Sequence, residues 1–202
     1  GFVSYLMDRN IYLERNGQTQ ALDNSSVMDY LPALAHTREE YAFVSKRSTH
    51  SDVYVGVLPA DDETQAAPPK ARKLLGLEAE VRIYRLAYSP SDRKLLIQAD
   101  NRLHVYDFST KALLQLPLEN MAVEGVSWVD DQHLLFSTVK NHQRYVRIIN
   151  TQTFKIQELP AEYLGGVYSL VDQHFYLLSK QGDSVVKLTD FNQVPAVTGF
   201  VC

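Results

Sequence analysis

The sequence predicts an all-β fold, and two observations carry that prediction. Apolar residues occur in runs of three to six between polar turns, and such runs are too short for helices. The same order of runs and turns then recurs, and the apolar residues that close the first strand of successive repeats are Leu34, Tyr88, Trp128 and Leu170. Their spacings are 54, 40 and 42 residues. Repeats of about 40–50 residues are typical of propeller blades. We therefore predict a β-propeller with about four full four-stranded blades plus one partial blade, either five-bladed or a fragment of a larger propeller.

The repeat at residues 126–159 shows the pattern most fully. Its strands are expected at 126–129, 134–136, 145–149 and 154–159, and its turns at 130–132, 140–144 and 150–153. The second strand is apolar throughout, as expected when both faces are covered. In the last strand, Phe154, Ile156 and Leu159 alternate with polar residues. That alternation suits an outer strand with one wet face.

The other repeats show the same order of apolar runs and polar turns. Residues 2–23 hold three strand-like runs, FVSYLMD, NIYLERN and QTQALD, with no first strand before them. The second repeat contains YLPALAH, EYAFVSK, DVYVGVL and RKLLGLE, the third IYRLAYS, KLLIQAD, RLHVYDF and ALLQLPL, and the fifth GVYSLVD, HFYLLSK, SVVKLTD and PAVTGFV. Residues 59–71 interrupt the second repeat with Pro, Ala and charge, which predicts a mobile insertion. Residues 1–202 then form a single propeller domain or a fragment of one.

Composition narrows the function classes. Apolar residues make up 45% and charged residues 22%, as in ordinary folded domains. A net charge of −4 gives no reason to expect contact with nucleic acid, and no run approaches the roughly 18 apolar residues of a membrane span. Cys202 is the single cysteine, so no internal disulfide can form. Because neither a start methionine nor a targeting segment is visible, we expect a piece of a longer chain that could form a homodimer through its open blades.

One stretch resembles a known family. AYSPSDRKLLIQADNRLHVYDF, at residues 87–108, is similar to the TolB-type propeller repeat, in which an aromatic-Ser-Pro-Asp-Gly-Lys turn precedes a strand. YAFVS, DVYV and NIYLER elsewhere are similar to parts of the same repeat. The Asp-Gly pair is missing from every repeat, and Ser91-Asp92 comes nearest to it. Such repeats occur in periplasmic TolB, in prolyl-oligopeptidase propellers and in the sensory domains of CadC-like transcriptional regulators.

No pattern indicates catalysis, a metal or a cofactor. The six histidines are scattered without metal-ligand spacing. His133 and His174 follow Asp-Gln in equivalent turns, so we expect both to stabilise those turns. No G-x-S-x-G is present, and Gly165-Gly166 lacks the Lys-Ser/Thr of a phosphate loop. Trp128, on a predicted inner strand, is expected in the core. We therefore expect no enzyme activity and no bound cofactor.

A charge pattern indicates a docking face. Loops between second and third strands carry basic residues, and the connections between blades carry acidic ones, namely Asp29, Glu78, Glu80, Glu119, Glu124 and Glu162. Both sets should lie at the same end of the blades. The predicted partner-binding residues are Arg47, Arg102, Lys140, His142 and Arg144. Their partner would be an acidic protein segment or a small anionic ligand. The alternative is that the two sets of charges pair with each other at the surface, where each pair contributes little.

The resemblance leaves three functions open. The first is a sensor or interaction domain, such as the periplasmic C-terminal part of a membrane-anchored CadC-like transcriptional regulator. The second is a TolB-like envelope scaffold protein. The third is the gating propeller of a prolyl-oligopeptidase-like hydrolase. We rank the sensor first because the chain shows no chemistry of its own.

Overall fold

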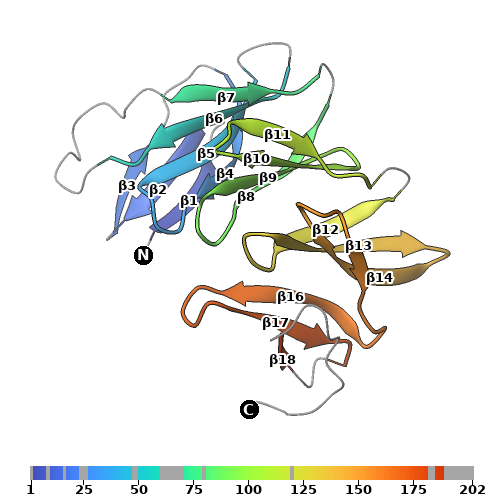
Figure 1. The fold of residues 1–202 in the computed structure, drawn as a ribbon. Coiled ribbons are helices and arrows are strands. Elements are labelled where there is room, and N and C mark those ends of the chain that lie inside the picture. Colours follow the sequence, from blue (N-terminus) through green and yellow to red (C-terminus); the bar gives the residue numbers. More distant parts are fainter. Residues whose placement is uncertain are drawn as a thin grey trace. The chain divides into compact units, whose positions relative to one another are not determined.

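The computed structural model describes residues 2–7, 10–15, 17–22, 27–46, 50–59, 71–78, 81–118, 121–181 and 185–188. Within these ranges the regular elements are eighteen β-strands, arranged in five sheets (Figure 1). The same ranges contain no helix that could cross a membrane. The prediction of an all-β protein built from repeated small sheets is confirmed.

In each sheet the strands pair in chain order. The first sheet contains β1 (Phe2–Met7), β2 (Asn10–Arg15) and β3 (Gln18–Ala21). The second contains β4 (Asp29–Leu34), β5 (Glu40–Ser45), β6 (Asp52–Val57) and β7 (Arg72–Gly76), and the third contains β8 (Ile83–Tyr88), β9 (Lys94–Ala99), β10 (Arg102–Asp107) and β11 (Ala112–Gln115). The fourth contains β12 (Val123–Trp128), β13 (His133–Lys140), β14 (Gln143–Asn150) and β15 (Ile156–Glu158), and the fifth contains β16 (Tyr163–Ser169), β17 (His174–Ser179) and β18 (Val185–Leu188).

Two predictions fall outside the described residues. The run PAVTGFV, expected as a fourth strand of the fifth repeat, lies beyond residue 188, and residues 60–70 of the expected insertion are also outside. Both stay predictions. The chain itself divides into two compact units, residues 1–100 with 106–110 and residues 101–105 with 111–202.

In the first unit, the second sheet is buried on both faces. Tyr41 and Phe43 of β5 belong to one apolar cluster, which also contains Ile11 of β2. The alternate residues Ala42 and Val44 belong to another cluster, shared with residues of β8 and β9. Successive side chains of a strand point to opposite faces. A continuous apolar strand therefore packs against a neighbouring sheet on each side, as blades do in a propeller.

The second unit repeats this packing. Leu135 of β13 and Ile148 of β14 share an apolar cluster with Phe175 and Leu177 of β17. Trp128 at the end of β12 is buried, as predicted for an inner strand. The fourth and fifth sheets therefore bury their facing sides against each other.

The fifth repeat differs from prediction by two residues. Trp128 pairs with Leu134, and the equivalent pair in the fifth sheet joins Tyr168 to Phe175. Leu170, predicted to close the first strand, instead lies in the turn and is exposed. The turn between β16 and β17 is one residue longer than its counterpart, and its VDQH is one residue shorter than VDDQH at 129–133, so the alignment of the two segments was displaced by two. With Tyr168 in the equivalent place, Tyr88, Trp128 and Tyr168 lie 40 residues apart.

A β-bulge recurs with the same period. The pairing of β8, β12 and β16 with the following strand skips one residue in each sheet. The skipped residues are Tyr84, Glu124 and Leu164, again 40 residues apart. A bulge bends its strand and changes the direction in which a side chain points. The structural repeat is thus more regular than the apolar pattern of the sequence.

The turn between β10 and β11 depends on a residue in an unfavourable conformation. Asp107 Oδ1 accepts hydrogen bonds from the backbone nitrogens of Ser109 at 2.8 Å and Thr110 at 3.1 Å. Lys111 then adopts φ = 57°. The fourth sheet has the same kind of turn, where Phe154 adopts φ = 60°. The prediction that Phe154 lies in the outer strand is therefore wrong: it belongs to the turn and is exposed, because its left-handed backbone cannot continue a strand.

Lys111→Gly is expected to stabilise the protein by about 0.5–1 kcal/mol. The left-handed conformation costs a residue with a Cβ about 1–2 kcal/mol, and the greater freedom of glycine in the unfolded chain offsets about half of that. Thermal unfolding should show a rise in Tm of about 2 °C. Lys155→Gly is the control, since φ at Lys155 is not among the positive values, and it should leave stability unchanged or lower it. A lower Tm for Lys111→Gly would contradict the assigned turn.

Candidate functional site

A four-stranded meander has two ends. In the fourth sheet, the turns β12–β13 and β14–β15 lie at one end, and the β13–β14 hairpin tip lies at the other. We call these the turn end and the tip end. The turn end contains His133, and the tip end contains three of the five predicted partner-binding residues.

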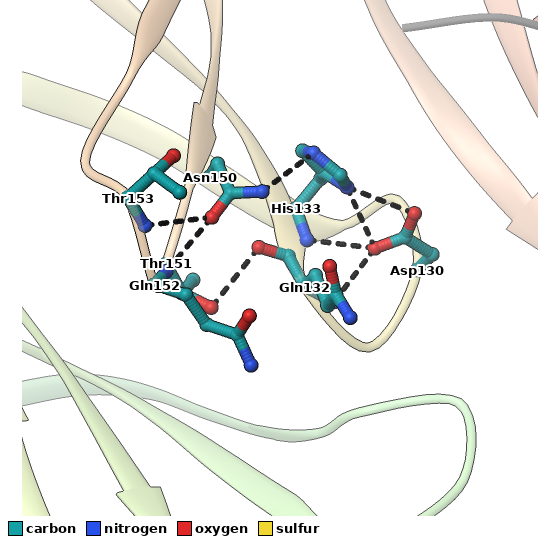
Figure 2. A network of polar contacts seen from close by, with 7 residues as sticks. All are labelled: Asp130, Gln132, His133, Asn150, Thr151, Gln152 and Thr153. Carbon is teal, nitrogen blue, oxygen red and sulfur yellow. Dashed lines mark hydrogen bonds and ion pairs between the residues drawn. The ribbon is translucent and has the colours of Figure 1, made fainter.

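At the turn end, Asp130 organises the first turn (Figure 2). Its Oδ1 accepts hydrogen bonds from the backbone nitrogens of Gln132 at 2.6 Å and His133 at 2.7 Å. The Nδ1 atom of His133 lies 2.9 Å from Oδ2 of the same carboxylate. Burial opposes ionisation of Asp130, but the hydrogen bonds from His133 and Gln132 outweigh it, so the pKa of Asp130 is lowered. The carboxylate is thus occupied in holding the turn.

The second turn is held by Asn150 in the same network (Figure 2). Asn150 Oδ1 accepts hydrogen bonds from the backbone nitrogens of Gln152 and Thr153, both at 2.9 Å. Its Nδ2 atom lies 3.0 Å from Nε2 of His133. The backbone nitrogen of Thr151 also donates to the carbonyl oxygen of Gln132 in the first turn, at 2.7 Å. His133 therefore links two turns.

His174 has a related place in the fifth sheet. Its Nδ1 atom lies 2.5 Å from the carbonyl oxygen of Asp172, and Asp172 also accepts a hydrogen bond from the hydroxyl of Tyr176. The hydrogen bonds from Tyr176 and Ser169 lower the pKa of Asp172 to about 2. The expectation that His133 and His174 stabilise their turns agrees with these contacts.

At the tip end, the β13–β14 hairpin is longer than predicted. Residues 140–144 were expected to be a loop, but pairing continues to the pair formed by Lys140 and Gln143. The turn consists of Asn141 and His142 alone, with φ of 52° and 63°. Two successive residues with positive φ form a type I′ turn, which suits the twist of a tight hairpin. Lys140 and Arg144 are therefore strand residues held by the ladder.

The tip extends past the neighbouring strands. Pairing with β12 ends at Thr138, and pairing with β15 begins at Arg147. The backbone nitrogen of Leu159 still donates to the carbonyl oxygen of Val146, and from Val139 to Tyr145 the ladder pairs only within the hairpin. Residues 139–144 are all exposed, whereas residues 134–138 at the base are buried. The tip is thus an exposed element on a rigid base.

The charges of the tip divide between its two faces. Val139 pairs with Arg144 and Lys140 with Gln143, so Arg144 and Lys140 point to opposite faces. Arg144 is joined to Glu124 of the β12 bulge, with 2.7 Å between Nη2 and Oε2. This is the pairing of basic and acidic sets that the alternative interpretation anticipated, at least for this pair. Among the described residues, no ion pair or hydrogen bond involves the side chain of Lys140 or His142.

The two remaining predicted residues do not belong to this hairpin. Arg102 is the first residue of β10, an exposed strand residue where a loop residue was expected, and Arg47 lies outside the described residues. Asp29, predicted on the acidic rim, is fully buried at the start of β4, opposite Ser45. The prediction for Asp29 is wrong because a charged residue before an apolar run is typical of a surface connection between strands.

A structural site that sequence patterns did not reveal lies in the first unit. Asp92, in the turn between β8 and β9, is fully buried and accepts hydrogen bonds from residues in the turn between β4 and β5. The donors are the backbone nitrogens of His36 at 2.8 Å, Thr37 at 2.7 Å and Arg38 at 3.2 Å, and the hydroxyl of Thr37 at 2.7 Å. We call this contact the Asp92 clamp. It joins two sheets through residues more than fifty positions apart.

Aromatic residues surround the Asp92 clamp. The guanidinium of Arg38 lies 4.8 Å from the ring centre of Phe108, which stacks on Tyr88 at 5.8 Å. The hydroxyl of Tyr88 donates to Glu40 at 2.9 Å. Burial and the neighbouring Glu40 carboxylate raise the pKa of Tyr88 far above its usual range. These polar groups satisfy one another between two sheets, which indicates a structural role.

Within the described ranges, no group of three or more His, Cys, Asp and Glu side chains is arranged to hold a metal ion. The titratable groups with shifted pKa values at the turn end and in the Asp92 clamp already have hydrogen-bond partners in the protein.

Comparisons with known proteins give the fold. No protein-family model matches the chain, and no curated protein matches it. TolB from Acinetobacter baumannii has a similar structure, with a TM-score of 0.62 and 12% identity over 90% of this chain and 49% of that chain. A nidogen/laminin complex has a TM-score of 0.61 and 8% identity over 93% and 73% of the two chains. A prolyl endopeptidase structure has a TM-score of 0.54 and 14% identity over 91% and 29%.

This chain spans about half the length of the Acinetobacter TolB chain. The similar structures are TolB-type and other β-propeller proteins. At these identities the likeness concerns the fold. Together with the blade-on-blade packing and the 40-residue structural period, it shows that the fold is an all-β propeller.

Proposed function

We propose that this chain is a non-enzymatic interaction propeller whose partner docks at the tip of the β13–β14 hairpin. One observation carries the proposal. Lys140 and His142 lie on an exposed tip with no charged partner among the described residues, while the base of the same hairpin is buried. Binding residues on exposed turns held by a rigid scaffold are common in proteins.

The chemistry of the tip favours an anionic partner. Lys140 provides an ammonium group and His142 an imidazole, and Val139 adds exposed apolar surface on the face opposite to Lys140, with 38% of the residue accessible. An acidic protein segment fits this combination, and a small anionic ligand is the second candidate. Exposed charge pairs contribute at most about 1 kcal/mol each, so a useful affinity requires several contacts at once. Arg102 and Arg47 belong to the proposal as the remaining predicted contacts.

The wider role rests on the family resemblance. We assign the chain to a sensor domain, in the manner of the periplasmic C-terminal part of a membrane-anchored CadC-like transcriptional regulator. A TolB-like envelope scaffold is the alternative supported by the likeness to TolB. The gating propeller of a prolyl-oligopeptidase-like hydrolase is the alternative supported by the likeness to a prolyl endopeptidase. The sequence of the full-length protein separates these three functions. A winged helix with one membrane span indicates the regulator, a signal peptide indicates the TolB-like scaffold, and a G-x-S-x-G motif indicates the hydrolase.

Charge reversal at the tip tests the docking site. The double variant Lys140→Glu with His142→Glu should lower the retention of envelope proteins on the immobilised chain about tenfold or more, which corresponds to about 1.4 kcal/mol. Tm should fall only slightly, because both side chains are exposed although residue 142 keeps a positive φ. Lys155→Glu, an equally exposed lysine at the turn end, is the matched control and should retain binding. Undiminished retention by the double variant, or no retention by the unmodified chain, would refute the proposal.

A further inference from the structure

His133 at the turn end has both ring nitrogens engaged by groups with fixed hydrogen-bonding roles (Figure 2). The side chain of Asp130 is a carboxylate, which can only accept a hydrogen bond. Nδ1 of His133 must therefore carry the proton and donate it to this carboxylate. Asn150 Oδ1 already accepts two backbone hydrogen bonds, so its Nδ2 atom faces the ring and donates. Nε2 of His133 must then be the acceptor. The geometry defines a neutral imidazole with its proton on Nδ1.

Protonation of His133 conflicts with this arrangement. A proton on Nε2 would face the N–H groups of Asn150 at a separation of 3.0 Å, donor against donor. The conflict ends if the Asn150 amide turns over, so that Oδ1 accepts from Nε2. Oδ1 then leaves the backbone nitrogens of Gln152 and Thr153, which lose their acceptor.

We propose that His133 and Asn150 form a proton-operated device in which protonation of the imidazole moves Asn150 Oδ1 away from the second turn. The change is local. The bond from the backbone nitrogen of Thr151 to the carbonyl oxygen of Gln132 does not involve Asn150, so the two turns stay joined there. The proposal goes beyond the proposed docking function, because it concerns the opposite end of the sheet.

The charges around His133 determine which contact changes. The turn that contains His133 also contains Asp130 and Asp131. The second turn contributes the neutral Asn150 and, beyond it, the exposed Lys155. From the fifth sheet, Tyr168 lies near Asp130, Asp131 and Asp172, since burial and these three carboxylates together raise its pKa. Asp130 accepts from Nδ1 of His133 whether or not Nε2 carries a proton. The contact to Asn150 is therefore the one that changes.

An NMR titration of the chain from pH about 8 to about 5, the range in which histidines change charge, tests the device. The amide protons of Gln152 and Thr153 should lose their hydrogen-bonded shifts, and their exchange, corrected for pH, should rise several-fold. Both changes should follow the titration of the His133 ring nitrogens. The amide proton of Thr151 should stay unchanged. Ser109 and Thr110 are an internal reference, because Asp107 holds their turn without a histidine.

Two variants give the matched comparison. In Asn150→Asp, a carboxylate can accept from Nε2 of the charged ring and from the turn nitrogens, so Gln152 and Thr153 should keep their bonds at low pH. In His133→Gln nothing titrates at this position, and no pH response should remain. The proposal is overturned if Gln152 and Thr153 do not respond in the unmodified chain. It is equally overturned if the Ser109 and Thr110 amides respond in parallel, or if Asn150→Asp responds as the unmodified chain does.

Discussion

Gly56→Ala is expected to destabilise the protein by about 3 kcal/mol, because no space exists for a methyl group at that position. A Cβ on Gly56 would lie 2.5 Å from Cζ and 2.6 Å from Cε1 of Tyr41, its cross-strand partner. Tyr41 cannot move aside easily. It is fully buried, stacks on Phe43 at 5.7 Å and donates its hydroxyl to the carbonyl oxygen of Leu22 at 2.8 Å.

Urea unfolding measures this effect, and thermal unfolding should show a fall in Tm of roughly 6–12 °C. Gly125→Ala is the matched control within a strand. The nearest atom to a Cβ on Gly125 is Ser137 Oγ at 3.5 Å, an ordinary contact, so stability should change by less than about 1 kcal/mol. Equal losses for the two variants would show that backbone propensity, not the Tyr41 ring, causes the effect.

Asp92→Ala should also be costly, with a loss of about 2–3 kcal/mol. The substitution removes a buried carboxylate and leaves the backbone nitrogens of His36, Thr37 and Arg38 without their acceptor. Asp92 also adopts φ = 60°, a conformation that Asp and Asn tolerate better than Ala. Asp92→Asn removes the charge and keeps the shape of the side chain. Its free energy of unfolding should therefore lie between those of Asp92→Ala and the unmodified chain.

The Asp92 clamp predicts a pH dependence with a definite sign. Burial opposes ionisation of Asp92, but hydrogen bonds from His36 and Thr37 outweigh it, and its pKa is lowered. A lowered pKa in the folded state means that the stabilisation is complete above the unfolded value of about 3.9 and is lost as the pH falls through the folded value. The difference in unfolding free energy between the unmodified chain and Asp92→Asn should therefore shrink in acid. A difference that stays constant down to pH about 2 would contradict the clamp.

Local pattern predicted the strands well, and the reason is physical. Side chains alternate between the faces of a strand, so runs such as Leu134–Phe136 indicate a strand covered on both sides without knowledge of its neighbours. The β13–β14 tip was missed because its polar sequence resembles a loop. Backbone pairing does not require apolar side chains, and a type I′ turn at Asn141 and His142 lets the ladder continue to the end.

Longer-range features were not accessible from the sequence. The Asp92 clamp joins residues more than fifty positions apart, and no local period records such a contact. The exact repeat was hidden in the fifth sheet by a turn one residue longer whose VDQH is one residue shorter than VDDQH, so that Leu170 was aligned in the place of Tyr168. Of the predicted partner-binding residues, Lys140, His142 and Arg144 do share one hairpin. Their orientation depends on strand register, so the pairing of Arg144 with Glu124 needed the structure.

Photocrosslinking from the two ends of the fourth sheet tests most directly whether the tip end is the docking site. A photoreactive amino acid is placed at His142 in one variant and at Lys155 in another, both exposed positions of the full-length protein, and crosslinking is carried out in the cells that produce it. The proposed function predicts a discrete crosslinked product from position 142 that disappears when Lys140→Glu is added, and none from position 155. A product from position 155 alone, or one from position 142 that Lys140→Glu leaves undiminished, would contradict docking at the tip.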